Sequence, residues 1–154
     1  MAINKILLAY NFTQLDQKAI DFVISAFAHL KETEITIFNA YTPVPDIETL
    51  DTSITGKLKG SMGYLGQQIT QRENELNEVK QQFVQAGFPE DRIKTQFQPR
   101  KRDIASEIIE SAVNNKFDVI VLNRKHARVT RFFSGSVSHK VVMNLKDTTV
   151  CIVS

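Results

Sequence analysis

Short apolar runs alternate with amphipathic segments along this chain, and this alternation restricts its possible folds more than any other feature. The clearest run is Val119-Ile120-Val121-Leu122, which follows Phe117 and Asp118. A continuous apolar run of this length is typical of a strand covered on both faces, as in a parallel sheet. Apolar residues also predict strands at residues 6–10, 34–40, 117–122 and 150–153, and a weak alternation predicts a short strand at 93–97.

Between these runs, apolar residues recur at steps of three and four, which predicts helices. The first helix begins after a capping-box-like start, Thr13-Gln14-Leu15-Asp16, and is expected to reach about Leu30. Further helices are expected at residues 67–86, with Gly87 as its C-terminal cap, at 104–113 after the cap Asp103, and at about 136–145. Residues 41–60 predict a long connection with room for a helical turn. Strands that alternate with helices predict one α/β domain over residues 1–154, with a mostly parallel open sheet between helices.

Charge and composition argue against several classes of protein. Lys and Arg number 19 against 17 Asp and Glu, so the chain lacks the basic excess typical of nucleic-acid binders. No segment approaches the roughly 20 apolar residues that span a bilayer, and the N-terminus lacks the pattern of a secretory signal. We therefore expect a soluble cytoplasmic protein. The single cysteine, Cys151, stands in an apolar run and is expected to be a core residue.

Catalytic and metal-binding patterns are weak. The sequence contains no nucleophile elbow and no Walker motif. His126 and His139 have no Cys or acidic partner at a spacing typical of metal sites. We expect no enzyme and no bound metal, and any ATP hydrolysis would be slow and incidental.

Three segments together resemble one known family. They are the opening strand and turn at residues 6–13, the unit 103–109 that leads to Asp118-Val119-Ile120-Val121, and Phe132-Phe133-Ser134-Gly135-Ser136-Val137-Ser138-His139-Lys140-Val141. The chain resembles the universal stress proteins over essentially its whole length. The resemblance implies a Rossmann-like five-stranded parallel sheet in the order 3-2-1-4-5 with helices on both faces. It also implies a homodimer joined through the last strand and a role in survival under stress.

Family members that bind ATP or AMP carry a loop of the form G-x2-G-x9-G-S/T. Glycines let backbone amides approach phosphate and ribose, and the final Gly-Ser/Thr starts a helix whose free N–H groups face the phosphates. Here Gly135-Ser136 keeps the last part of the loop. Counting from the fourth strand places Asn123 and His126 at the first two glycine positions, with one residue missing before Gly135. Counting back from Gly135 places Leu122 and Lys125 there, so neither register restores a glycine.

Other positions of the implied nucleotide pocket are mixed. Asn11 stands where binders carry an acidic residue near the base, and its amide can still form hydrogen bonds with a base. Phe12 replaces a small residue, and can stack on a ligand or simply fill space. The resemblance implies an apolar pocket wall made of Ala9, Ala40, Leu122 and Val137.

Two interpretations of the loop remain open. Gly135-Ser136-Val137 is either an anion site at a helix N-terminus or an ordinary helix cap. Arg124, Lys125, Arg128 and Arg131 are either substitutes for lost phosphate contacts or a solvated basic loop.

The sequence therefore favours a non-catalytic, dimeric stress-response module whose adenine-nucleotide binding is weak, altered or absent. An alternative is an ATP- or AMP-binding regulatory switch that holds phosphates with Gly135-Ser136 and the basic loop 124–131. A partner- or RNA-binding module that uses this loop is a third, less favoured class. The implied site residues are Ala9, Asn11, Ala40, Leu122, Asn123, Arg124, Gly135, Ser136 and Val137.

Overall fold

Five parallel strands form one sheet at the centre of the protein. The computed structural model describes residues 5–30, 32–43, 52–124 and 137–154, with the backbone alone for 52–62. The strands are β1 (Lys5–Ala9), β2 (Glu34–Tyr41), β3 (Ile93–Pro99), β4 (Val119–Asn123) and β5 (Thr149–Val153). Their order is β3-β2-β1-β4-β5, and every neighbouring pair is parallel. The expected fold and strand order are confirmed.

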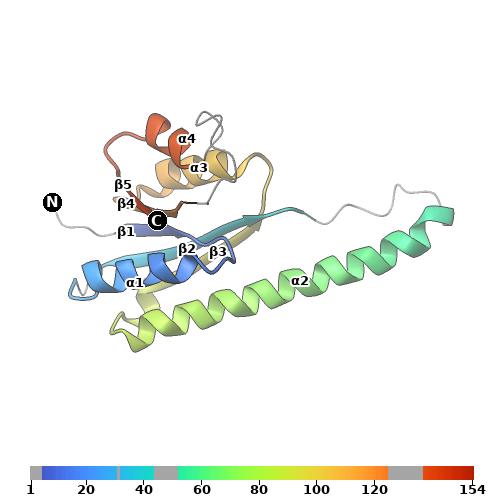
Figure 1. Ribbon diagram of the computed structural model, residues 1–154, viewed down its shortest axis with the longest axis horizontal. Helices are drawn as coiled ribbons and strands as arrows, with labels where there is room; N and C mark the ends of the chain where they lie inside the picture. The colour runs from blue at the N-terminus through green and yellow to red at the C-terminus, as the bar shows by residue number, and fades with distance from the viewer. Residues whose placement is uncertain (1–4, 31, 44–51, 125–136) are drawn as a thin grey trace.

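Helices cover both faces of this sheet (Figure 1). Helices α1 (Asp16–Phe27) and α2 (Thr52–Gln85) lie on one face, and α3 (Ile104–Asn115) and α4 (Val137–Asn144) on the other. A short 3-10 turn, η1 (Glu90–Arg92), precedes β3. Alternate residues of β1 enter two separate cores, because successive side chains of a strand point to opposite faces. Ile6 and Leu8 pack with α1 and α2, whereas Leu7 and Ala9 pack with α3 and α4.

Helix α2 corrects the prediction for residues 41–60. It begins at Thr52 and runs for 34 residues, whereas we expected a long connection as far as about residue 60. Each glycine in a helix costs about 1 kcal/mol relative to alanine, so the glycine-rich start of α2 is a weak helix signal. The helix is anchored by Leu76, Val79 and Phe83, all at most 2% exposed, and its first half extends beyond the sheet (Figure 1). In the described part of the chain no helix is both long enough and apolar enough to cross a membrane.

Two predicted caps are confirmed. At the end of α2, the Gly87 N–H bonds to the Val84 carbonyl and the Phe88 N–H to the Phe83 carbonyl, both at 3.1 Å, as in a Schellman motif. Gly87 has φ +108°, a conformation that favours glycine. At the start of α3, the Asp103 carboxylate accepts the Ser106 N–H.

Candidate functional site

The carboxyl ends of β1 and β4 lie side by side at the centre of the sheet, where the strand order changes direction. In open α/β sheets this is where ligands bind. The loop after β1 and the described start of the loop after β4 therefore border the candidate site, as expected from the sequence. Within the second loop Arg124 is described, and Lys125, His126, Arg128, Arg131, Gly135 and Ser136 lie outside the described residues.

The four residues predicted to form an apolar wall lie in one hydrophobic cluster. Ala9, Ala40 and Leu122 are 3–5% exposed and belong to one cluster on the α3 and α4 side of the sheet, with Val137 packed against it. Ala9 ends β1, Ala40 lies near the end of β2, and Leu122 near the end of β4. Four predicted site residues thus come together from four elements.

Asn123 lies at the end of β4, but its side chain belongs to the opposite side of the sheet. Val119 and Val121 point to the same face of β4 as Asn123, because alternate residues of a strand share a face. Both pack with the α1 and α2 core. The Asn123 amide is buried and donates a hydrogen bond to Oδ1 of Asp16, at the start of α1. The bulky residue at the first glycine position therefore points away from the apolar wall. It fixes the beginning of the loop to α1 instead.

Asp16 is a site residue that the sequence analysis did not identify. Its carboxylate is 2% exposed and accepts the backbone N–H groups of Asn11 at 3.0 Å and Thr13 at 2.7 Å, besides the Asn123 amide. Burial raises the pKa of Asp16, and the three hydrogen bonds oppose this shift. The contact with Thr13 is half of the predicted capping box. The predicted position of the helix cap, at Thr13, is wrong. The residue directly before the helix is Leu15, and it makes no side-chain cap bond.

Asn11 and Phe12 lie in the loop that Asp16 holds. Phe12 adopts φ +60°, and its ring packs edge-on against Tyr10, with ring centroids 4.9 Å apart. The Arg72 guanidinium of α2 lies 5.2 Å from the centre of the Phe12 ring. Of the two roles expected for Phe12, these contacts favour filling space on the α2 side. Asn11 is half-buried, and its backbone, not its side chain, makes the bond to Asp16.

Polar contacts also fix the end of β1 to its neighbours. The Tyr10 hydroxyl donates to Oε1 of Glu75 in α2 at 3.0 Å, and Nδ2 of Asn39 donates to the Tyr10 carbonyl at 2.7 Å. Burial, followed by the bond to Glu75, raises the pKa of Tyr10. Among the described residues, two buried side-chain atoms have no hydrogen-bond partner, and these are Oδ1 of Asn39 and Oδ1 of Asn123. Both lie on the α1 and α2 side of the sheet, beneath the loop after β1.

The first backbone amide after β4 is already engaged. The Arg124 N–H bonds to the Val153 carbonyl of β5 at 2.8 Å, so this amide continues the sheet.

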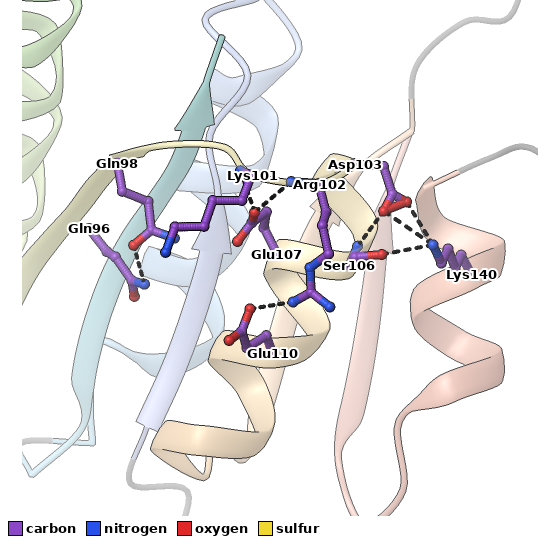
Figure 2. Close-up of polar contacts among 9 residues, drawn as sticks. All are labelled: Gln96, Gln98, Lys101, Arg102, Asp103, Ser106, Glu107, Glu110 and Lys140. Carbon is purple, nitrogen blue, oxygen red and sulfur yellow. Dashed lines mark hydrogen bonds and ion pairs between the residues drawn. The ribbon is translucent and has the colours of Figure 1, made fainter. Parts of the chain in front are cut away.

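At the other end of the loop, Lys140 attaches α4 to α3. Its ammonium contacts the Asp103 carboxylate at 2.7 Å and the Ser106 hydroxyl at 2.8 Å (Figure 2).

Metal-binding and thiol chemistry find little support in this geometry. No group of three or more His, Cys, Asp or Glu side chains within the described ranges could hold a metal ion. Cys151 is half-buried against the α1 and α2 core, and burial raises the pKa of its thiol. A thiol with a raised pKa is less nucleophilic at neutral pH.

Comparisons with known proteins agree with this fold. The model of the Universal stress protein family matches residues 2–152. Universal stress protein UspA from Lactobacillus plantarum is 16% identical, with a TM-score of 0.70, over 100% of this chain and 99% of its own. A universal stress protein in complex with cAMP is 18% identical, with a TM-score of 0.67, over 100% and 98% of the two chains. The universal stress protein from Archaeoglobus fulgidus in complex with dAMP is 15% identical, with a TM-score of 0.63, over 100% of both. No curated protein matches the chain.

Proposed function

This chain belongs to the universal stress protein family, and we propose that it is a non-catalytic stress-response module that binds adenine nucleotides weakly and mainly through the adenosine part. Two structures with this fold are complexes with cAMP and dAMP, which supports an adenine nucleotide as the ligand class. A cytoplasmic location and a homodimer joined through β5 belong to the same proposal.

The observation that carries this proposal is the state of the backbone where β4 ends. Nucleotide binders of the family use glycines there so that backbone amides can face the ligand. Here the Asn123 side chain is bound to Asp16, and the Arg124 amide is bound to β5. Turning either group toward a phosphate would break a bond that the fold already uses, at a cost of about 1 kcal/mol or more each. The wall formed by Ala9, Ala40, Leu122 and Val137 is unaffected by these contacts.

Calorimetric titration with adenosine, AMP and ATP tests this function. We expect affinities that differ by less than about tenfold, because the described backbone amide directly after β4 is already bound within the sheet. An ATP affinity higher than that of adenosine by a factor of about 100 or more would contradict the proposal.

The alternative, a switch in which basic side chains hold the phosphates, makes the opposite prediction. A charged hydrogen bond to phosphate contributes about 1.5–3 kcal/mol, so Arg124→Ala would weaken ATP binding about tenfold or more and leave adenosine binding unchanged. Lys101→Ala removes a comparable positive charge outside this site and serves as the matched control. Equal ATP affinity of the parent and both variants would exclude the switch mechanism for Arg124.

Support for the dimer comes from the edge position of β5. It pairs with β4 alone in the sheet, and Ile152 on this strand is 46% exposed. An edge strand with an exposed apolar side chain is a ready template for pairing with a second chain. Light scattering on the purified protein gives the oligomeric state directly, and a monomer at all accessible concentrations would contradict this part of the proposal.

A further inference from the structure

A polar pocket lies between β3 and α3, away from the candidate nucleotide site. Its volume is about 360 Å³, near the lower end of the range of about 300–1,000 Å³ typical of small-molecule sites. The polar and charged side chains that line it include Gln96, Gln98, Lys101, Glu107, Glu110 and Ser111. None of the predicted nucleotide-site residues that the structure describes lines it. Of the described residues that do, only Pro99 is apolar, so the pocket offers no surface on which a nucleobase could stack.

Helix α3 contributes two buried polar side chains to this pocket. Glu107 and Ser111 are one turn apart on the helix and are only 4% and 5% exposed. Oε1 of Glu107 accepts the backbone N–H groups of Lys101 at 2.8 Å and Arg102 at 3.0 Å, which fixes the carboxylate in place. Figure 2 shows the second oxygen of this carboxylate on the side of the two β3 glutamines. The pocket therefore has a rigid, charged acceptor on its helical wall.

Hydrogen bonds orient a row of polar groups that runs from α3 to β3. Nδ2 of Asn115 donates to the Ser111 carbonyl at 3.0 Å, and the Ser111 hydroxyl donates to Oε1 of Gln96 at 3.0 Å. Nε2 of Gln96 then donates to Oε1 of Gln98 at 3.1 Å. Since the Gln98 oxygen is the atom that faces Gln96, its NH₂ group is left to donate at the far end of the row.

A positively charged side chain, Lys101, lines the same pocket as Gln98. Figure 2 shows the Lys101 side chain extending from the turn after β3 toward Gln98. The neighbouring cation, Arg102, is instead paired with Glu110 of α3. One part of the pocket thus offers an amide donor and an ammonium group, and another part offers the Glu107 carboxylate. Charged partners of opposite sign on two walls suit a ligand that carries both charges.

We propose that this β3–α3 pocket binds a small zwitterionic metabolite of the α-amino acid class. Lys101 and Gln98 receive its carboxylate, and Glu107 receives its ammonium group. The amides that line the pocket favour a polar side chain on the ligand. This pocket is distinct from the candidate nucleotide site, because the two share no side chain among the residues that the structure describes.

L-Glutamine is a suitable probe, since its ten non-hydrogen atoms carry both charges and an amide. Calorimetric titration of the full chain is expected to give a Kd of about 1 mM or tighter. Two analogues test the two contacts: 4-aminobutanamide lacks the carboxylate, and glutaramate lacks the ammonium group. Each analogue is expected to bind at least about tenfold more weakly than L-glutamine, because it loses the contact with one charged side chain.

Lys101→Ala locates the site. It removes the ammonium group but keeps the backbone N–H that Glu107 holds, so the turn is preserved. We expect L-glutamine to bind about tenfold more weakly to this variant, and 4-aminobutanamide, which has no carboxylate, to be unaffected. A second variant, Gln98→Glu, places a negative charge beside the ligand carboxylate. It is expected to weaken L-glutamine binding by the same factor. Lys94→Ala is the matched control, because Lys94 is an exposed lysine of β3 that pairs with Glu34 outside the pocket.

Several results would overturn this inference. They are absence of L-glutamine binding at about 10 mM, equal affinity for L-glutamine and 4-aminobutanamide, or equal losses in Lys101→Ala and Lys94→Ala. AMP titration of Lys101→Ala separates the two sites. Unchanged AMP affinity alongside lost L-glutamine affinity supports a separate pocket, whereas parallel loss of both contradicts it.

Discussion

Replacing Asp16 by alanine is expected to destabilise the protein by an amount that its contacts predict. The variant leaves three donors without their acceptor: the N–H groups of Asn11 and Thr13 and the buried Asn123 amide. At about 1–1.5 kcal/mol for each lost bond, the total is about 3–4.5 kcal/mol. Removing the buried charge returns part of its desolvation cost, which is the same effect that raises the pKa of Asp16. We therefore expect a net loss of about 2–4 kcal/mol in the free energy of unfolding at neutral pH.

Urea denaturation of the parent, Asp16→Ala and Asp21→Ala measures this difference. Asp21 is an exposed carboxylate of the same helix that bonds to Gln17, so it controls for loss of a charge from α1. Its replacement is expected to change the stability by no more than about 0.5 kcal/mol. The account of the site is wrong if Asp16→Ala and Asp21→Ala have the same stability.

The pH dependence of stability is a second test of Asp16. Its pKa is raised in the folded state above the ordinary value of 3.8, so the folded protein binds this proton more tightly than the unfolded chain does. The stabilisation by the bound proton is fully present below about pH 3.8 and is lost as the pH rises through the raised folded value. Asp16→Asn cannot titrate, so the difference in stability between parent and variant should change over this window. A constant difference from neutral pH down to the ordinary carboxyl range would show that the pKa of Asp16 is not raised.

Three further predictions concern the scaffold and the dimer. Phe83→Ala, at a side chain with no exposed surface, should lower the free energy of unfolding by about 3–5 kcal/mol in urea denaturation, and a loss below about 1 kcal/mol would contradict the anchoring of α2. Gly87→Ala should cost about 1–2 kcal/mol in the same assay. Space is available for the added methyl group, so the cost reports the backbone at φ +108° alone, and an unchanged stability would argue against that conformation. Ile152→Lys should shift the proposed dimer toward monomer in light scattering, and a dimer that persists unchanged would exclude pairing through β5.

Strands β1 and β4 were predictable from the sequence because each is a short apolar run that needs cover on both faces, whereas alternation signalled β3 only weakly. The run at residues 117–122 and the observed β4 (Val119–Asn123) illustrate this, since its residues are all buried. The start of α2 was not predictable, because its glycines oppose helix formation locally. Its helical state is fixed further along the chain, where Leu76, Val79 and Phe83 pack on the sheet. A helix that is anchored at one end can extend through residues with a weak intrinsic preference.

The candidate site was predictable in its location and only partly in its contacts. Family resemblance placed Ala9, Ala40, Leu122 and Val137 on one wall, and the structure brings them together. The bond between Asp16 and Asn123 joins residues 107 positions apart, so no local pattern indicates it. The spacing of Thr13 and Asp16 did indicate a carboxylate that reaches back to a backbone N–H. It gave no sign that the same carboxylate also holds the end of β4.

The central claim is that the backbone where β4 ends is held by the fold and is not available to phosphate. Amide NMR spectra of the 15N-labelled protein, recorded during addition of ATP, test this most directly at the Arg124 N–H. We predict that the Arg124 amide keeps its slow hydrogen exchange and its chemical shift, because it remains bound to the Val153 carbonyl of β5. Loss of exchange protection at Arg124, together with a large shift of its amide on ATP binding, would contradict the claim.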